Sequence, residues 1–380
     1  MASVQTPLGP FGLLNMLIRL LFVVPLLLFT VIRGLPIAIR RGVSIKFWLL
    51  SAFYRVVMGY LKPVEIQYLA APARRVYPTW LAKKRTNASR LGNANALNRL
   101  VEDVEPLGEV GARIMWLGDR KKAAKVVLFF HGGGYVAPIL KGHFTWCWNC
   151  YVGDGPGVKG EVAVAILEYT LCPQAQYPTQ LQQAVAALNH VLKSGIAPGD
   201  LVMGGDSAGG NLTCQVINHI LRPHQEVEPV RLRSPLAGVF MVSPLLTFRT
   251  ETASFRDNGH VDMLSAAIVS RGNTYIFPVE SLKRRAANPH RPLPLDGDSE
   301  WFGEIQTVAK AVYFTAGEQE VFRDDVRAFA EAVRRCNPDV DVKLDVAANE
   351  IHDSILLESE LGVIGDATKR MRQWASKCLA

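Results

Sequence analysis

From about residue 110 onward, short apolar runs alternate with longer segments of helical periodicity. The apolar runs that predict strands are 112–117, 123–130, 162–167, 201–203, 239–242, 312–315 and 342–346. Helical spacing of apolar residues falls between them, at 181–192, 212–221 and 326–333. Strands that are apolar on both sides and separated by helices are typical of parallel sheets, which need a cover on each face. The pattern predicts an α/β protein with a mostly parallel central sheet and helices on both faces.

The composition excludes several other classes. Hydrophobic residues make up 49% of the 380 residues and charged residues 20%, which allows a large core and argues against a disordered chain. Six cysteines are too few for a disulfide scaffold, and they show no metal-ligand spacing. Cys147 and Cys150 are compatible with a local disulfide or with two reduced thiols on a helix.

The positive charge of the chain is concentrated near its N-terminus. The net charge is +8, yet the first 90 residues contain thirteen Lys or Arg and a single acid, Glu65. The rest of the chain is therefore slightly acidic. Basic residues interleaved with apolar runs are typical of a segment next to a membrane rather than of a nucleic-acid-binding face, so we expect no nucleic-acid partner.

Residues 11–32 form the longest apolar run, 22 residues that would extend about 30 Å as a helix, enough to cross a bilayer once. Arg33, Arg40 and Arg41 follow the run, and no small-residue cleavage site is visible, which favours a retained single-pass anchor. A signal peptide and a buried helix of a soluble protein are the alternatives.

A second apolar stretch, 45–61, has no clean stripe and predicts either a lid or interfacial helix or an ordinary core helix. We divide the chain into an anchor with cap helices (1–62), a basic connecting or cap segment (63–109) and a catalytic domain (110–380). Basic residues after the span favour the cytosol for this domain, whereas the Asn87-Ala88-Ser89 sequon would matter only in a lumen, so the side stays open.

The segment Gly205-Asp206-Ser207-Ala208-Gly209 stands between an apolar run and a helical pattern. In the order strand, turn, helix, a G-x-S-x-G segment is typical of a nucleophile elbow, which projects the serine hydroxyl above the edge of the sheet. The positions two before and two after the serine need glycine because they crowd against each other. The helix that follows directs its N-terminal N–H groups at the place where negative charge would develop.

A second glycine-rich segment, His131-Gly132-Gly133-Gly134, follows the predicted strand 123–130. Consecutive glycines allow backbone N–H groups to point at a substrate, as in an oxyanion hole. The predicted donors are Gly132, Gly133 and Ala208. A phosphate-binding loop is the alternative, but the residues that such a loop needs are missing.

A serine nucleophile needs a base and an acid that orients the base. His352, which follows the last predicted strand, is the candidate base. Glu320 is the candidate acid, because it lies in the loop after the preceding strand. Asp324 and Asp325 begin the next helix and fit first-turn acids better, while Glu318 is a spare candidate.

The motifs HGGGY, GDSAGGN and EIHD together resemble the hormone-sensitive-lipase-like branch of the α/β-hydrolases, over roughly residues 110–370. The N-terminal anchor is similar to that of the fungal steryl acetyl hydrolase type. The resemblance implies an α/β-hydrolase fold in which Ser207, Glu320 and His352 form the catalytic triad, although most members have Asp at the position of Glu320. It also implies that residues before about 110 help to cap the active site, and it favours a lumenal catalytic domain.

These features predict a serine carboxylester hydrolase that needs no metal or organic cofactor. The apolar N-terminus indicates a lipophilic ester taken from or near a membrane, such as an acetylated sterol, a lipid or a polyketide-type ester. The expected location is an endomembrane, for example the endoplasmic reticulum. An amidase or lactonase with the same triad is one alternative, and a non-catalytic small-molecule receptor on the same fold is another. The oligomeric state stays open.

Overall fold

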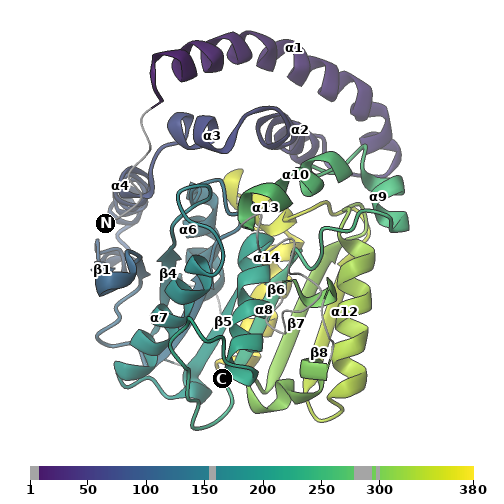
Figure 1. The fold of residues 1–380 in the computed structure, drawn as a ribbon. Helices are drawn as coiled ribbons and strands as arrows, with labels where there is room; N and C mark the ends of the chain where they lie inside the picture. The colour runs from purple at the N-terminus through teal and green to yellow at the C-terminus, as the bar shows by residue number, and fades with distance from the viewer. Residues whose placement is uncertain (1–7, 154–159, 278–292, 297–299) are drawn as a thin grey trace.

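The computed structural model describes residues 8–153, 160–277, 293–296 and 300–380. Within these residues the chain forms one eight-stranded sheet, with helices on both of its faces and along one edge (Figure 1). The strands are β1 (Val104–Pro106), β2 (Arg113–Leu117), β3 (Lys125–Phe130), β4 (Val162–Glu168), β5 (Leu201–Asp206), β6 (Gly238–Val242), β7 (Ala311–Gly317) and β8 (Asp341–Ala347).

The sheet has the strand order β1-β2-β4-β3-β5-β6-β7-β8. Strands β3 to β8 pair in parallel, and β2 pairs antiparallel with both β1 and β4. Every strand predicted from the apolar runs is present, and the α/β fold with a mostly parallel sheet is confirmed. The short strand β1 was missed because two of its three residues are exposed and give no apolar run.

The described helices have the following bounds: α1 (Pro10–Arg40), α2 (Ile45–Tyr60), α3 (Pro63–Leu69), α4 (Ala73–Arg90), α5 (Ala94–Arg99), α6 (Lys141–Cys147), α7 (Thr179–Lys193), α8 (Ala208–Leu221), α9 (Ala253–Asn258), α10 (Ala266–Ile276), α12 (Arg323–Cys336), α13 (Ser354–Glu360) and α14 (Asp366–Cys378).

Alternate residues of the central strands face two separate apolar clusters. In β3, Leu128 and Phe130 pack with α7, α8 and α12 on one face, and Val127 and Phe129 pack with α4, α6 and α14 on the other. Strands covered on both faces in this way must be apolar on both sides, which explains their continuous apolar sequence. Cys147 and Cys150 are buried free thiols on the second face.

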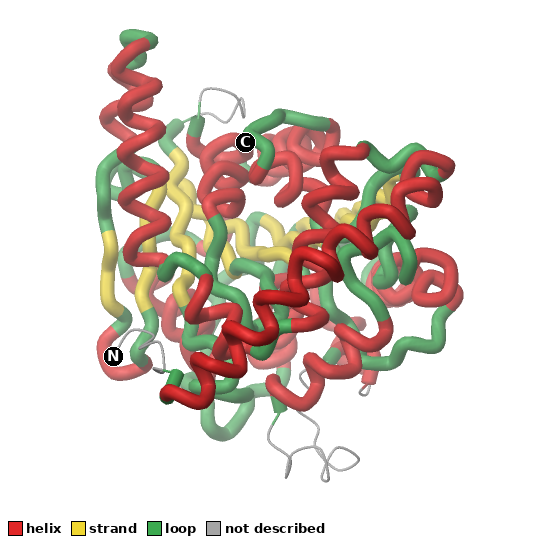
Figure 2. Tube along the Cα trace, turned by 90° about the horizontal axis from the view of Figure 1, so that it is seen from above, coloured by secondary structure: helices red, strands yellow, loops and turns green. Residues whose placement is uncertain are grey.

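Helices α1, α2, α3 and α10, here called the cap, cross over the carboxyl edge of the sheet (Figures 1 and 2). Two arginines fasten α2 to neighbouring segments. Arg55 donates to the carbonyl oxygens of Gly259, Asp262 and Leu264, and Arg271 of α10 donates to carbonyl oxygens at the end of α2. The cap is thus attached through backbone carbonyl groups, and those of α2 lie at its C-terminal end, where carbonyls have no partner within the helix.

Helix α1 is the one described helix that is long and apolar enough to cross a membrane, with a mean hydropathy of 2.3 in its most apolar window. That property is shared by signal sequences and by core helices of soluble proteins. The helix is longer than the predicted run 11–32, because it continues past Pro25 and Pro36 to Arg40. It lies along α2 in this structure (Figure 1).

Candidate active site

Ser207 stands on a sharp turn between β5 and α8. Its backbone has φ 49° and ψ −111°, a strained conformation for a residue with a side chain. Hydrogen bonds fix the turn: the Ser207 N–H donates to the carbonyl of Val242 at 2.8 Å, and the Ser207 carbonyl accepts from Leu245 and Asn211, both at 3.0 Å. The local order of strand, turn and helix is the one that the sequence predicts.

The glycines on either side of Ser207 have no space for a side chain. A Cβ on Gly205 would lie 2.1 Å from the carbonyl oxygen of Phe130 and 2.8 Å from the carbonyl carbon of Gly209. A Cβ on Gly209 would lie 1.9 Å from the same Phe130 oxygen. The crowding predicted from the motif is therefore present, and the end of β3 takes part in it.

His352 lies next to Ser207, although 145 positions separate them in the chain. The distance from His352 Nε2 to Ser207 Oγ is 3.0 Å, within hydrogen-bond reach. Both side chains are buried, with 8% of Ser207 and 2% of His352 exposed. The ring of Phe322 packs edge-on against the imidazole at a centroid distance of 5.2 Å. The two predicted residues are thus brought together in a site with little water.

Glu320 lies in the loop after β7 and is fully buried. Its Oε2 accepts hydrogen bonds from Ser243 Oγ at 2.6 Å and from the Gly317 N–H at 2.8 Å. Its Oε1 and the Nδ1 of His352 are both buried without a hydrogen-bond partner among the described residues. Burial raises the pKa of Glu320, and the positive charge of a protonated His352 works against that increase.

The other candidate acids face away from this arrangement. Asp324 accepts from the Ser254 N–H and from Arg323 Nε, each at 2.8 Å. Glu318 forms ion pairs with Arg323 and Arg327 of α12. Of these three carboxylates, Glu320 is the one whose charge raises the pKa of His352.

Asp353, the residue after the candidate base, lines the site and was not predicted to be part of it. Its Oδ2 lies 3.3 Å from His352 Nε2, and its Oδ1 is buried without a hydrogen-bond partner among the described residues. Burial alone would lower the pKa of His352, but the carboxylates of Asp353, Glu320 and Asp262 outweigh burial and raise it. The left-handed backbone of Asp353, with φ 52°, turns its side chain back toward the imidazole.

Asp262 is a second carboxylate that the sequence did not reveal. Its Oδ1 accepts from the His352 N–H at 3.1 Å, and its Oδ2 accepts from the Val321 N–H at 2.8 Å. One buried side chain therefore connects the loop of the candidate base with the loop of the candidate acid. Asp262 follows α9 in a stretch with no motif, so no sequence spacing pointed to it.

The glycine-rich loop after β3 differs from the prediction at one position. The Gly132 N–H donates to Asp206 Oδ1 at 3.1 Å, so the same hydrogen is not free for an oxyanion. Gly133 and Gly134 line the cavity beside Ser207 and have left-handed φ values of 99° and 60°. The Gly132 donor is thus occupied by a side chain of the nucleophile elbow, whereas Gly133 lies where the sequence placed it.

Asp206 is itself held by a buried histidine. His143 Nδ1 accepts from the Leu140 N–H at 3.0 Å, so the proton of the neutral ring is on Nε2, which lies 3.3 Å from Asp206 Oδ2. Burial lowers the pKa of His143, but the charge of Asp206 outweighs it and raises the pKa overall. This pair fixes the carboxylate that orients Gly132.

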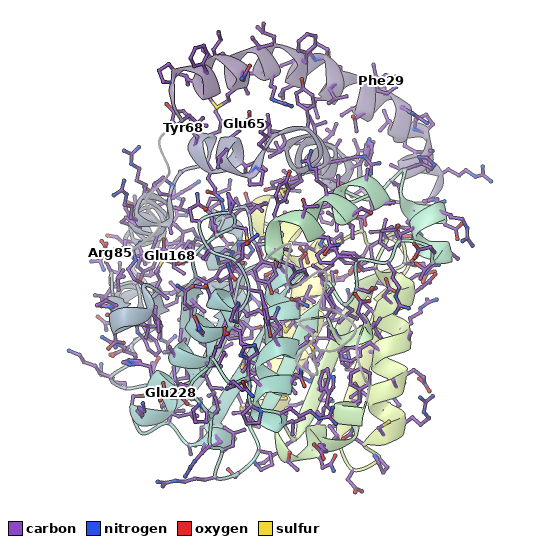
Figure 3. The ribbon with its side chains drawn as sticks, viewed as in Figure 1. Phe29, Glu65, Tyr68, Arg85, Glu168 and Glu228 are labelled. Atoms are coloured by element: carbon purple, nitrogen blue, oxygen red, sulfur yellow. The ribbon has the colours of Figure 1, made fainter. Side chains whose placement is uncertain are left out.

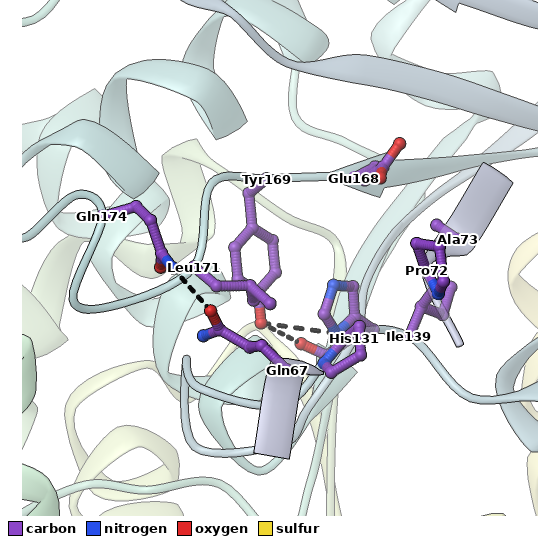
Figure 4. A pocket seen from close by; sticks show the side chains of 10 residues that line it. Gln67, Pro72, Ala73, His131, Ile139, Glu168, Tyr169, Leu171 and Gln174 are labelled. Carbon is purple, nitrogen blue, oxygen red and sulfur yellow. Dashed lines mark hydrogen bonds between the residues drawn. The ribbon is translucent and has the colours of Figure 1, made fainter. Parts of the chain in front are cut away.

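His131, the first residue of the glycine-rich segment, packs against other side chains. Its ring stacks on Tyr169 at a centroid distance of 4.3 Å, and the Tyr169 hydroxyl donates to the His131 carbonyl at 2.7 Å (Figure 4). Complete burial lowers the pKa of His131 to about 3, so the ring is neutral. In the same small pocket, Gln174 donates to Gln67 of α3 at 2.6 Å, which joins the cap to the loop after β4.

A cavity of about 420 Å³ lies between Ser207 and the cap. Apart from the reacting groups and a few polar side chains, its walls are apolar. The cap residues that line it are Leu20, Val23, Phe53, Tyr54, Val57, Met58, Leu61, Pro63, Ile66, Leu69, Ile268, Val269, Arg271, Gly272, Tyr275 and Ile276. Such a cavity fits a lipophilic molecule with one polar group near Ser207. The described residues contain no cluster of His, Cys, Asp and Glu arranged to hold a metal ion.

Comparisons with known proteins agree with this geometry. Residues 127–356 match the family described as alpha/beta hydrolase fold, and this range is more than half of the chain. The chain therefore belongs to that family. The predictions of an α/β-hydrolase of the hormone-sensitive-lipase-like branch, and of a carboxylic ester hydrolase as the enzyme class, are confirmed. The similarity to steryl acetyl hydrolases stays a prediction.

Individual relatives are distant. An acetyl-hydrolase of Streptomyces hygroscopicus is 26% identical over 246 residues, which are 63% of this chain and 71% of that protein. The arylacetamide deacetylase of Bos taurus is 25% identical over 217 residues, 53% of this chain and half of its own length. A hormone-sensitive lipase from a metagenome library has a similar fold, with a TM-score of 0.60 at 19% identity over 87% of this chain and 97% of its own.

Proposed function

We propose that the protein hydrolyses lipophilic carboxylic esters, with Ser207 as nucleophile, His352 as general base and Glu320 as the acid that orients the base. The observation that carries this proposal is the 3.0 Å contact between His352 Nε2 and Ser207 Oγ inside a buried, mostly apolar cavity. A hydroxyl and an imidazole at this distance are the minimum that acyl transfer through a serine requires.

In the first half of the reaction, Ser207 Oγ attacks the ester carbonyl carbon while Nε2 of His352 accepts the hydroxyl proton. The tetrahedral intermediate then expels the alcohol, which takes that proton, and leaves an acyl group on Ser207. In the second half, His352 removes a proton from water, the resulting hydroxide attacks the acyl carbon, and the acid leaves as Ser207 regains its proton. One ester and one water thus give one acid and one alcohol.

Glu320 is proposed to hold the Nδ1–H of His352 during this cycle. In the structure, both Glu320 Oε1 and His352 Nδ1 are buried and unpaired among the described residues, and their charges interact. A hydrogen bond between these two atoms would satisfy both. Because buried polar atoms are costly to leave unpaired, the imidazolium formed in the first step favours that contact.

The oxyanion is proposed to accept hydrogen bonds from the backbone of Gly133, Gly134 and Ala208. Gly133 and Gly134 line the cavity at Ser207, and Ala208 is the first residue of α8, where the N–H groups have no partner within the helix. Each donor of this kind contributes about 3 to 4 kcal/mol to lowering the barrier. Gly132 supports the loop through Asp206 instead of donating directly.

The cap determines the proposed substrate class. Its apolar lining favours esters with a large hydrocarbon part, such as an acetylated sterol, a lipid or a polyketide-type ester. We assign residues 1–62 to the anchor and cap helices, 63–109 to a connecting or cap segment and 110–380 to the catalytic domain. Strand β1 lies within 63–109, and α10 adds to the cap from within 110–380.

Labelling with a fluorophosphonate probe tests the proposal, because the probe reacts with an activated serine. The wild-type protein is expected to be labelled and to hydrolyse p-nitrophenyl esters. Ser207→Ala is expected to lose labelling and about 10⁴-fold or more in kcat. Ser376→Ala, on the distant helix α14, is the matched control and should behave as wild type.

Persistent labelling of Ser207→Ala would reject the nucleophile. Strong binding of an ester without turnover by the wild-type protein would instead support the non-catalytic receptor. The amidase and lactonase alternatives use the same triad, so a panel of anilides and lactones beside the esters distinguishes them by relative kcat/KM.

A further inference from the structure

Helix α1 has two apolar faces, and among the described residues protein covers only one of them. The inner stripe recurs every three or four residues and consists of Met16, Leu20, Val23, Leu27, Val31, Gly34 and Ala38, all buried or half-buried. The outer stripe has the same spacing and consists of Leu14, Leu17, Leu21, Val24, Leu28 and Ile32, each between 51% and 73% exposed. A helix that is apolar all round is normally surrounded by protein or by lipid.

The inner face is packed against the body through specific contacts. A Cβ on Gly34 would lie 2.2 Å from the ring of Trp48 in α2, and Trp48 Nε1 donates to the Val31 carbonyl at 3.3 Å. Trp48 is fully buried by this packing. A helix that crossed a bilayer away from α2 would expose this tryptophan. The contacts therefore favour α1 lying along the cap.

A second set of contacts holds the N-terminal half of α1. Arg19 Nε lies 3.5 Å from Glu65 Oε1 of α3, and its guanidinium also donates to the Tyr60 carbonyl at 3.4 Å. The side chain of Glu65 is 3% exposed, so loss of Arg19 would leave a buried charge without its ion pair. Figure 3 shows Glu65 and Tyr68 together on α3, and Phe29 farther along α1 toward its C-terminal end.

Helices α2 and α3 also have exposed apolar side chains. Ile45, Leu49 and Phe53 of α2 and Tyr68 and Leu69 of α3 are 44% to 51% exposed. Phe53 and Leu69 also line the cavity above Ser207. The rim of the cavity therefore carries exposed apolar side chains.

The charge of this surface matches anionic lipid. The first acid in the sequence is Glu65, which is buried and paired, so no carboxylate precedes it on α1 or α2. Arg33, Arg40, Lys46 and Lys62 are exposed around the apolar stripe. Exposed apolar side chains flanked by Lys and Arg are typical of helices that lie in the interface of an anionic membrane.

We propose that α1 lies in the plane of an anionic membrane surface as the roof of the cavity, instead of crossing the bilayer. Its outer face enters the boundary between headgroups and acyl chains, its inner face covers the cavity, and the cavity rim opens toward the lipid. An ester dissolved in the membrane then reaches Ser207 without passing through water. Only this last step depends on the proposed function.

Flotation of the full chain with vesicles tests the docking surface. We expect the wild-type protein to float with vesicles of phosphatidylcholine and phosphatidylserine, and less with phosphatidylcholine alone. The double variant Leu21→Glu/Leu28→Glu should lower the bound fraction at phosphatidylserine vesicles about tenfold or more. Leu91→Glu, at a residue 76% exposed after α4, is the matched control and should float as wild type.

Flotation of the double variant at the wild-type level would overturn the proposal. A second result would also overturn it: the wild-type protein does not bind vesicles and sediments as a dimer, whereas the double variant sediments as a monomer. The outer face would then be covered by a second copy of the chain.

Spin labels distinguish a helix in the plane from one that crosses. Single cysteines at Leu14→Cys, Leu21→Cys, Leu28→Cys and Ile32→Cys, with Cys336 and Cys378 replaced by serine, report the depth of each position in the bilayer. A helix in the plane gives similar, shallow depths at all four positions. A profile that passes through the centre of the bilayer along the chain would overturn the proposal.

Two ester assays separate this inference from the proposed function. The double variant is expected to hydrolyse a soluble acetate ester within about twofold of wild type and to lose about tenfold of its rate on a long-chain ester held in vesicles. Equal losses on both substrates would contradict entry from the membrane. If the wild-type protein hydrolysed no ester in either assay, the proposed function would be rejected, and the flotation and depth results would be unaffected.

Discussion

The carboxyl edge of the sheet and the cap face each other across one cavity, but they are built differently. At the edge, Ser207, Glu320 and His352 are held by short hydrogen bonds and by glycines that leave no room for a Cβ. The cap presents apolar side chains, and the outer face of α1 is exposed in the part of the chain that the structure describes. Chemistry and access to substrate are thus assigned to separate parts of the molecule, which can be changed independently.

The largest change in kcat that would sharpen the contrast between the sheet edge and the cap is expected on substitution of Glu320. Glu320→Gln keeps the shape of the side chain but removes the charge that stabilises the imidazolium, so kcat should fall by about 10²- to 10⁴-fold on short and long esters alike. Asp324→Asn, whose carboxylate bonds to Ser254 and Arg323 instead, should stay within a few-fold of wild type. Steady-state kinetics on two chain lengths measures both, and the reverse ranking would assign the role to Asp324.

The next effect concerns stability of the cap. Gly34→Ala places a Cβ against the ring of Trp48 and should destabilise the packing of α1 by about 1 to 3 kcal/mol. Gly12→Ala, where the nearest atom is the end of the Leu8 side chain at 3.3 Å, is the matched control. The measurements are thermal denaturation and the rate of tryptic cleavage at Arg40 and Arg41. Equal resistance of both variants to trypsin would show that α1 does not pack on α2 in solution.

A smaller effect is expected in the pH dependence. The carboxylate of Asp353 helps to raise the pKa of His352, which favours the protonated imidazole. Asp353→Asn should therefore lower that pKa, so that the neutral base forms at lower pH and the acid limb of kcat/KM moves down by about one pH unit. Asp366→Asn, on the far helix α14, should leave the profile unchanged. An upward shift in Asp353→Asn would contradict the sign of this argument.

The smallest effect separates the two faces of one helix. Leu20→Trp fills the roof of the cavity and should raise KM for a decanoate ester several-fold while leaving that for an acetate ester nearly unchanged. Leu21→Trp, its neighbour on the outer face, should change neither. If both substitutions gave the same result, the inner and outer faces of α1 would not be distinct.

Much of this protein follows from local sequence. The strands are visible because burial on both faces demands unbroken apolar runs. The elbow is visible because Gly205 and Gly209, only four positions apart in the chain, both pack against the Phe130 carbonyl. His352 was found by its order relative to the strands. The strand and elbow signals require only neighbours in sequence, and the His352 signal requires only the order of elements along the chain.

Other features were decided by the tertiary structure. Asp262 accepts a hydrogen bond from the backbone of His352, 90 positions away in the chain, and Asp206 accepts one from the N–H of Gly132, 74 positions away. Residues so far apart belong to no short sequence motif, so neither bond could be predicted from spacing. Likewise, the sequence of α1 determines that the helix is apolar all round. Which face contacts α2 and α3, and which stays exposed among the described residues, is determined by contacts such as those of Trp48 and Glu65, because only packing against other helices makes two apolar faces different.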